Sequence, residues 1–260
     1  MSPADPLQPT SRFTGCADAY AKHRPSYPRE AIDATLAGAP AAHGLRVIDI
    51  GAGTGISARL YAQRGCAVTA IEPNAEMRAA GASQSPDIGF VDGTAERTGL
   101  PDACADLVVC AQAFHWFDPP RALREFARIL DPRSPLHRVA LVWNIQDTTD
   151  AGTAGYQRII AAHAVEEPTS PWRLAPGEPL ASDDARGAGF AGARVDRFPS
   201  HQVLDEDGLV GRAMSASYMP RDAEKRGIVE RELRALFREF GQEGAFRLRY
   251  RTEVHMAERS

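Results

Sequence analysis

Between Leu45 and Leu141, apolar runs of strand length alternate regularly with amphipathic stretches of helix length. This alternation indicates βα units, in which parallel strands form one sheet and helices cover both of its faces. The run DLVVC at 106–110 is almost entirely apolar, which is typical of a strand buried on both faces. We expect strands at 45–50, 67–71, 88–91, 106–110 and 139–143, and helices at 56–64, 74–82 and 120–130. The chain is therefore predicted to be an α/β protein.

The alternation stops after Asp147 and resumes in another form. Prolines and glycines interrupt the stretch 148–180, which is predicted to be a cap insertion with one helix at 156–165. The last strand alternates polar and apolar residues, which suits an antiparallel strand at the edge of the sheet. Beyond the cap we expect a short helix at 182–189, a strand at 193–204, a long helix at 221–240 and the last strand at 246–256.

Composition and charge exclude several classes of function. The 30 basic and 34 acidic side chains leave a net charge of -4, which disfavours a partner rich in phosphates such as nucleic acid. No run of about 18 apolar residues predicts a membrane helix, and the N-terminus lacks the pattern of a signal peptide. The four cysteines and seven histidines show no metal-ligand spacing. We expect a cytoplasmic protein without a metal site.

The strongest local signal is VIDIGAGTG at 47–55, where three glycines follow a strand and open a helix. Glycines there let a ligand approach the backbone closely, and they leave N–H groups at the helix start that can face an anion. Glu72, at the end of the next strand, can accept hydrogen bonds from both hydroxyls of a ribose. Together these features predict a site for a nucleoside cofactor.

The glycine spacing separates two kinds of nucleoside cofactor. A dinucleotide fingerprint reads G-x-G-x-x-G, whereas this chain has Ile56 at the position of the third glycine. Asp49 also brings a carboxylate to the loop, which would repel a pyrophosphate but suits a ligand with an ammonium group. The spacing therefore favours a cofactor other than NAD or NADP.

Several longer motifs then carry a resemblance to a known family. They are VIDIGAGTGISARLYAQRG from 47, AIEPN at 70–74, FVDGTAERTGLPDACADLVVCAQAFHWFD at 90–118 and LREFARIL at 123–130. In this order they resemble class I S-adenosylmethionine-dependent methyltransferases. ADAYAKHRPSYP at 17–28 is similar to the start of a small-molecule (type 11-like) branch of that family. The loop 131–137 departs from the family, because relatives commonly have a short glycine turn there.

The resemblance implies a Rossmann-like, seven-stranded sheet that is mostly parallel with an antiparallel last strand, with helices on both faces and a cap or lid. It also implies four parts of the chain. These are an N-terminal arm and helix covering the cofactor at 1–44, an S-adenosylmethionine-binding core at 45–147, the cap insertion at 148–180, and the C-terminal part of the sheet at 181–260 with a lid segment near 205–220.

The resemblance also implies the residues that bind S-adenosylmethionine. Gly51, Ala52 and Gly53 would lie against its methionine part, with Asp49 near the amino group, and Glu72 would take the ribose hydroxyls. The remaining contacts are expected from Tyr20 and Arg24 in the N-terminal segment, with Arg24 at the carboxylate, from Pro73 and Asn74 bordering the adenine, from Thr94 and Ala95 at the adenine edge, and from Gln112 near the sulfonium.

Methyl transfer from a sulfonium needs positioning and a dry pocket more than a covalent catalyst. A base is needed only if the acceptor loses a proton, and His115, just past the fourth strand, is the best candidate; a structural role for it stays open. Aromatic residues predicted at the pocket favour a flat or apolar acceptor. The predicted acceptor contacts are Tyr27, Phe114, Trp116, Trp143, Tyr156, His201 and Tyr218.

The sequence therefore predicts methylation of a small molecule at O, N or C, with an aromatic or heteroaromatic secondary metabolite as the acceptor. The alternatives are an NAD(P)-dependent oxidoreductase and a non-catalytic protein that binds S-adenosylmethionine. The oxidoreductase is opposed by Ile56 and by the lack of a Tyr-x-x-x-Lys catalytic pair. We expect no nucleic acid or membrane partner, and a monomer or homodimer.

Overall fold

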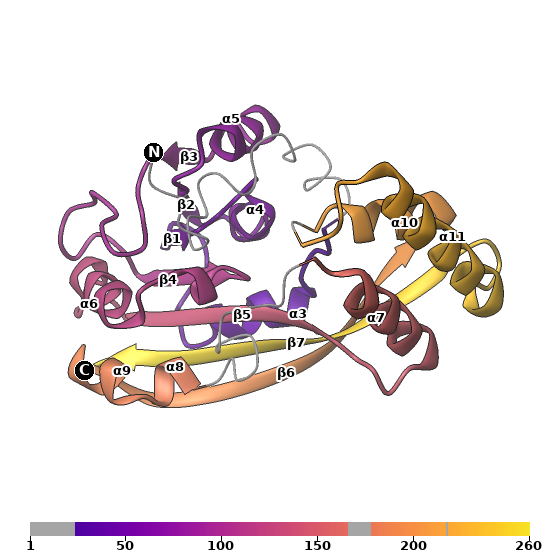
Figure 1. Cartoon of the computed structure of the whole chain (residues 1–260). Coiled ribbons are helices and arrows are strands. Elements are labelled where there is room, and N and C mark those ends of the chain that lie inside the picture. Colours follow the sequence, from indigo (N-terminus) through magenta and orange to yellow (C-terminus); the bar gives the residue numbers. More distant parts are fainter. Residues whose placement is uncertain (1–23, 166–177, 217) are drawn as a thin grey trace.

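A computed structural model of the chain describes residues 24–165, 178–216 and 218–260. Its centre is a seven-stranded sheet with the order β3-β2-β1-β4-β5-β7-β6 (Figure 1). The strands are β1 (Arg46–Ile50), β2 (Ala67–Ile71), β3 (Gly89–Val91), β4 (Leu107–Ala111), β5 (Arg138–Gln146), β6 (Phe190–Leu204) and β7 (Phe246–Arg259). The prediction of an α/β fold with seven strands is confirmed.

Only β7, the last strand in the sequence, is antiparallel to the other strands of the sheet. Strands β1 to β5 pair in parallel, whereas β7 pairs antiparallel with both β5 and β6. The predicted antiparallel last strand is therefore confirmed, but its predicted place at the edge is wrong, because β6 forms that edge. The alternating pattern of β7 arises because one face of its first half is covered and the other is exposed to solvent.

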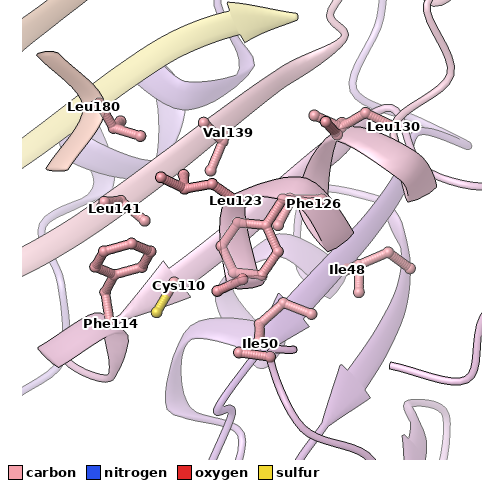
Figure 2. Close-up of a cluster of buried hydrophobic side chains, with 14 of the residues drawn as sticks. Ile48, Ile50, Cys110, Phe114, Leu123, Phe126, Leu130, Val139, Leu141 and Leu180 are labelled. Atoms are coloured by element: carbon pink, nitrogen blue, oxygen red, sulfur yellow. The ribbon is translucent and has the colours of Figure 1, made fainter. Parts of the chain in front are cut away.

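Helices cover both faces of the sheet. They are α3 (Arg29–Leu36), α4 (Ile56–Ala62), α5 (Ala75–Gln84), α6 (Pro119–Ile129), α7 (Ala151–His163), α8 (Glu178–Ala181), α9 (Asp183–Gly187), α10 (Glu206–Met214) and α11 (Ala223–Phe240). On one face, apolar side chains of β1, β4 and β5 pack against α6, α8 and α9, with Phe126 and Leu123 of α6 at the centre (Figure 2). On the other face, the same strands pack against α3 and α4.

A third apolar cluster lies beyond the end of β5. Residues 246–249 of β7 pair with β6 alone, so these two strands extend as a ribbon past their neighbour. Helices α7, α10 and α11 pack on that ribbon through Tyr156, Leu209, Leu233 and Leu248, among others (Figure 1). We call α7, α10, α11 and this ribbon the C-terminal module. It stands at the carboxyl ends of the parallel strands, since Gln146 at the end of β5 pairs with Tyr250.

The sequence placed some helix limits correctly and missed others. Asn74 caps α5 as expected, because its side chain accepts a hydrogen bond from the N–H of Met77 at 3.0 Å. Helix α7 begins at Ala151, five residues before the predicted start, since Asp150 is its N-cap. Helix α10 falls in the stretch where only a lid was predicted. The functional division of the chain into arm, core, cap and lid stays a prediction.

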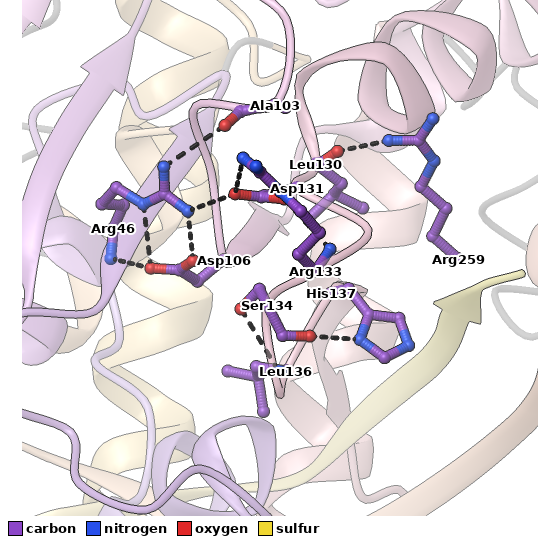
Figure 3. A network of polar contacts seen from close by, with 10 residues as sticks. All are labelled: Arg46, Ala103, Asp106, Leu130, Asp131, Arg133, Ser134, Leu136, His137 and Arg259. Atoms are coloured by element: carbon purple, nitrogen blue, oxygen red, sulfur yellow. Dashed lines mark hydrogen bonds and ion pairs between the residues drawn. The ribbon is translucent and has the colours of Figure 1, made fainter.

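The opposite end of the sheet is held by charged side chains. The Arg46 guanidinium binds Asp106 through Nη2–Oδ1 at 2.5 Å and Nε–Oδ2 at 3.1 Å, and its Nη2 also lies 3.3 Å from Asp131 Oδ2 (Figure 3). Burial by itself raises the pKa of Asp106, but the bonds from Arg46 outweigh it and hold that pKa below its ordinary value. Arg133 adds three hydrogen bonds to Asp131, one from its backbone N–H and two from its guanidinium, which fixes the unusual loop at 131–137.

Two properties of the described residues bear on function. No helix in the described part of the chain is both long enough and apolar enough to cross a membrane. Within the same residues, no three or more histidine, cysteine, aspartate or glutamate side chains come together as a metal site would require.

Candidate functional site

Two hollows open at the carboxyl ends of the parallel strands, where ligands bind in open α/β sheets. The first, which we call the glycine groove, spans about 500 Å³, including space that is open to solvent. It is bounded by the loops that follow β1, β2 and β4. Its lining residues are Gly51, Gly53, Glu72, Pro73, Met77, Ala111, Gln112, Ala113, Trp116 and Phe117.

The second hollow, which we call the aromatic cavity, is larger, at about 1130 Å³. The end of β5, the start of β7, the segment before α3 and the C-terminal module all contribute to it. Its lining residues are Arg24, Pro25, Tyr27, Ile56, Gln112, His115, Trp143, Asn144, Ile145, Gln146, Gln157, Arg212, Tyr218 and Tyr250. Gln112 lines both hollows, so the groove and the cavity meet at this residue.

The glycine loop requires glycine both for its backbone and for its packing. Gly51, Gly53 and Gly55 have φ angles of 68°, 58° and 80°, which residues with side chains rarely adopt. A Cβ atom at position 51 would lie 2.6 Å from the Cβ of Ala113, closer than two such carbons can approach. The loop after β1 therefore packs directly on the turn after β4, and together they form one wall of the glycine groove.

The N–H groups of this loop are bonded within the chain. Those of Gly51 and Ala52 both donate to the carbonyl oxygen of Ile71, at 2.8 and 3.1 Å. The N–H of Gly53 donates to Glu72 Oε2 at 2.9 Å. The expectation that the loop offers free N–H groups to an anion is wrong for these three glycine-loop residues. A pyrophosphate would lose the donors that it needs there, which weakens the dinucleotide alternative further.

Glu72 is held in place at the end of β2 with acceptor capacity to spare. Its Oε1 accepts the N–H of Asn74 at 2.9 Å, while its Oε2 accepts that of Gly53. Burial raises the pKa of Glu72, and these two bonds offset only part of that rise. A carboxylate has about four acceptor sites, so the hydroxyls of a ligand in the groove can still bind to it.

Asp49 lies beneath the glycine loop rather than in the groove. It is fully buried, and its Oδ2 accepts the hydroxyl of Ser57 at 2.5 Å. Among the described residues, its Oδ1 has no hydrogen-bond partner. Burial raises the pKa of Asp49 to about 7, although the bond from Ser57 opposes the rise. Asp49 can therefore act on a cationic group in the groove through its charge, across the loop.

Gln112 has an unusual backbone conformation and is held by hydrogen bonds to the neighbouring strand. Its φ angle is 59°, in the left-handed region, which costs a residue with a side chain about 1 kcal/mol. Its N–H donates to the carbonyl oxygen of Val142 at 2.9 Å, and its Nε2 to that of Asn144 at 3.2 Å. Both partners belong to β5, so the neighbouring strand holds Gln112 at the junction of the two hollows.

Most of the predicted site residues lie at one of the two hollows. In the glycine groove these are Gly51, Gly53, Glu72, Pro73, Gln112 and Trp116, and in the aromatic cavity Arg24, Tyr27, His115, Trp143 and Tyr218, again with Gln112. The imidazole of His115 lies against the ring of Trp116, with the ring centroids 4.9 Å apart. Tyr20 lies outside the described residues. The ligand contacts themselves stay predictions.

Other predicted residues line neither hollow. On the cofactor side these are Ala52, Asn74, Thr94 and Ala95, of which Ala95 belongs to the core with 2% exposure. On the acceptor side, Phe114 is fully buried against Phe126, and Tyr156 lies in the apolar cluster of the C-terminal module. His201 is exposed on β6, opposite Arg249.

Several lining residues escaped the sequence analysis, among them the polar residues Asn144, Arg212 and Tyr250. A signal for two of them was present. Arg212 occupies the helix face that Leu209, Ala213 and Ala216 bury, so it is a lone charge among apolar positions spaced as on a helix. Tyr250 lies on the inward face of an alternating strand. Asn144 gave no signal, because its role depends on which strands become neighbours.

Comparison with known proteins assigns this architecture. A family model described as "Methyltransferase domain" matches residues 48–136, which contain the glycine loop, Glu72, Gln112 and His115. Residues 48–136 are thus similar to a methyltransferase domain. A candidate type II methyltransferase from Anaeromyxobacter dehalogenans has the same fold over 91% of this chain and 97% of its own, with a TM-score of 0.61 and 23% identity. The expected family and Rossmann-like fold are thereby confirmed.

Curated relatives match the methyltransferase domain but not the whole chain. An uncharacterised methyltransferase of Mycobacterium tuberculosis is 44% identical over 135 residues, which are 52% of this chain and 53% of the relative. The malonyl-[acyl-carrier protein] O-methyltransferase of Pectobacterium atrosepticum is 37% identical over 126 residues, or 48% of each chain. The chain thus spans about half the length of the curated relatives that it matches.

Proposed function

We propose that this protein is an S-adenosylmethionine-dependent methyltransferase that acts on a small molecule. The observation that carries the proposal is the meeting of the two hollows at Gln112. A groove with a glycine loop and the carboxylate of Glu72 suits the cofactor, and a wider cavity on the other side of Gln112 suits an acceptor. The sequence of residues 48–136 supports the same assignment.

The residues of the glycine groove fit this cofactor. Glu72 has two acceptor sites left for the ribose hydroxyls, and Pro73 lies beside it at the groove wall. Gly51 lets the loop pack directly against Ala113 at the groove wall, and the buried carboxylate of Asp49 lies below it as a counter-charge for an amino group. Arg24 reaches the site from the N-terminal side and would bind a carboxylate.

When bound, S-adenosylmethionine supplies an electrophilic methyl group on a cationic sulfur. The chain contributes position and exclusion of water, because a direct in-line displacement requires the acceptor atom to be held on the axis of the breaking bond. Gln112 stands at that junction on a rigid backbone. Trp143 and Tyr27 form apolar walls beyond it, which would keep water away from the acceptor.

His115 is proposed as a base for acceptors that lose a proton on methylation. It lines the aromatic cavity three residues after Gln112, within the short helix Phe114–Trp116. A histidine near neutral pH can accept a proton from an oxygen or nitrogen nucleophile. Replacing His115 with Gln should lower the rate of O- or N-methylation about 100-fold with little change in cofactor affinity.

For the acceptor we propose an aromatic or heteroaromatic compound of secondary metabolism, such as a phenol or an indole, methylated at O, N or C. Support comes from the rings of Tyr27, Trp143, Tyr218 and Tyr250, which surround the cavity. The name of the Pectobacterium relative includes O-methylation, so oxygen acceptors belong in the first assays.

Thermal unfolding with excess ligand tests the cofactor first, since a ligand that binds only the folded state raises the midpoint. S-adenosylhomocysteine and S-adenosylmethionine should raise it, whereas NAD and NADP should not. A shift with NAD or NADP alone would overturn the proposal in favour of an oxidoreductase. Transfer of a labelled methyl group to phenols, indoles and small carboxylic acids then separates an enzyme from a protein that only binds the cofactor.

A further inference from the structure

The aromatic cavity contains a buried arginine. Arg212, on the inner face of α10, has only 7% of its surface exposed and lines the cavity together with Tyr218 and Tyr250. The hydroxyl of Tyr250 lies beside the guanidinium without completing a well-formed hydrogen bond. The guanidinium therefore sits among aromatic rings at the wall of the cavity.

Within the described residues, Arg212 forms no ion pair, and its Nε has no hydrogen-bond partner. Arg138 shows how the same fold treats another buried arginine. The Nε of Arg138 is likewise unpartnered, but Arg138, 5% exposed, binds Glu258 through Nη2 at 3.0 Å and the carbonyl oxygen of Ala37 through Nη1 at 2.8 Å. Burying a charge is costly unless it is paired, so the missing partner of Arg212 calls for a ligand.

The remainder of the cavity also favours an anion. None of the described residues that line it is acidic, while Arg24 adds a second guanidinium. Arg24 lies close to the end of α10, since its Nη2 is 3.4 Å from the carbonyl oxygen of Ser215. Two positive groups in a cavity without a carboxylate set up a field that attracts negatively charged molecules.

We infer that the acceptor is an aromatic organic acid whose carboxylate binds Arg212, while its ring lies against Trp143 and the tyrosines of the cavity. A planar guanidinium binds a carboxylate through two parallel hydrogen bonds, which fixes the orientation of the acid as well as its affinity. This inference rests on the proposed function and names the class of its substrate.

The carboxylate at Arg212 serves as an anchor and not as the methylated group. Arg212 reaches the cavity from the C-terminal module, whereas the cavity meets the glycine groove at Gln112, on the sheet. An acid anchored at Arg212 therefore extends its ring toward Gln112. A ring oxygen, nitrogen or carbon is then the methyl acceptor.

The test compares acids with neutral isosteres on the full-length protein. Benzoate and indole-3-acetate are titrated against benzamide and indole-3-acetamide, with and without S-adenosylhomocysteine, for the wild type and for Arg212→Met. Arg231→Met is the matched control, because Arg231 is exposed on α11 and lines neither hollow. Arg212→Lys, which keeps the charge but loses the paired hydrogen bonds, is the second variant.

We expect the acids to bind the wild type at least tenfold more tightly than the amides, and Arg212→Met to lose that preference while Arg231→Met keeps it. Arg212→Lys should lie between them. Arg212→Met should unfold at no lower temperature than the wild type, because it removes a buried unpaired charge.

Equal binding of acids and amides to the wild type would overturn the inference, as would an acid preference that survives in both Arg212 variants. Loss of S-adenosylhomocysteine binding in Arg212→Met would also overturn it, because Arg212 would then hold the cofactor's carboxylate. Failure of the wild type to bind S-adenosylhomocysteine would instead contradict the proposed function, and the contrast of acids with amides on the unliganded protein would still test the anion site.

Discussion

The two hollows that meet at Gln112 are built in different ways. Apart from the turn after β4, the glycine groove comes from one continuous stretch, from the loop at Gly51 to Met77. The aromatic cavity gathers residues from the whole described chain, from Arg24 to Tyr250. The first hollow coincides with the family match at 48–136, and the second comes largely from residues outside it. A local motif thus fixes the groove, whereas tertiary packing fixes the cavity.

The largest expected effect is on ligand binding in the glycine groove. Gly51→Ala should weaken binding of S-adenosylhomocysteine at least 100-fold, because the new Cβ would lie 2.6 Å from that of Ala113 and the wall must shift. Gly99→Ala is the matched control: Gly99 has a similar φ of 74° but no atom within 4 Å of the added carbon. Calorimetric titration of both variants should show the loss at position 51 alone. Equal affinities would mean that the loop does not hold the cofactor.

A smaller loss is expected at Glu72, the proposed ligand of the ribose. Glu72→Gln should weaken S-adenosylhomocysteine binding about 10- to 30-fold, because an amide offers one acceptor oxygen in place of two. Asp92→Asn serves as the control, since its side chain is 74% exposed, pairs with Arg78 and lines neither hollow. If Asp92→Asn lost more affinity than Glu72→Gln, the ribose would bind at the end of β3 instead.

The charged network of Arg46, Asp106 and Asp131, at the other end of the sheet, should affect stability but not ligand binding in either hollow. Asp106→Asn breaks the paired bonds from Arg46, and we expect the free energy of unfolding to fall by roughly 1–3 kcal/mol. Urea unfolding measures this change. Binding of S-adenosylhomocysteine to the folded variant should stay as in the wild type; a weaker affinity would show that the two ends of the sheet are coupled.

A further effect is a difference in pH dependence between Asp49 and Glu125. Burial keeps Asp49 protonated up to about pH 7 in the folded protein, whereas in the unfolded chain Asp49 is protonated only up to about pH 4. The contribution of Asp49 to the free energy of unfolding therefore falls as the pH rises from about 4 to about 7 and does not change further above about pH 7. Glu125 has the opposite sign. Burial raises the pKa of Glu125, but bonds from Arg128 and Thr98 outweigh burial and lower that pKa to about 2. Glu125 therefore stabilises the folded protein above pH 4.5, and this stabilisation is lost as the pH falls toward 2.

Urea unfolding at pH 5, 6, 7 and 8 measures the contribution of Asp49. Asp49→Asn should gain stability relative to the wild type as the pH rises from 5 to 7, and the gain should then level off. Glu125→Gln should run parallel to the wild type over the same range, because Glu125 is ionised in both states there. A parallel curve for Asp49→Asn would contradict the assigned burial of that carboxylate.

The features that the sequence could predict are those set by local motifs, and the features that it could not predict depend on tertiary packing. The strands β1 to β5 and the position of Glu72 were predictable, because each depends on a run of neighbouring residues. The position of β7 inside the sheet was not, since alternation reports only which faces are covered and not which strands become neighbours. Arg212 could be recognised as a charge on an apolar helix face, but only once α10 was known to be a helix.

The most direct test of the account is a crystal structure of the complex with S-adenosylhomocysteine. We predict that both ribose hydroxyls bind Glu72 and that the sulfur lies beside Gln112 and faces the aromatic cavity. A ribose away from Glu72, or a sulfur turned away from that cavity, would contradict the claim that the two hollows form one methyl-transfer site.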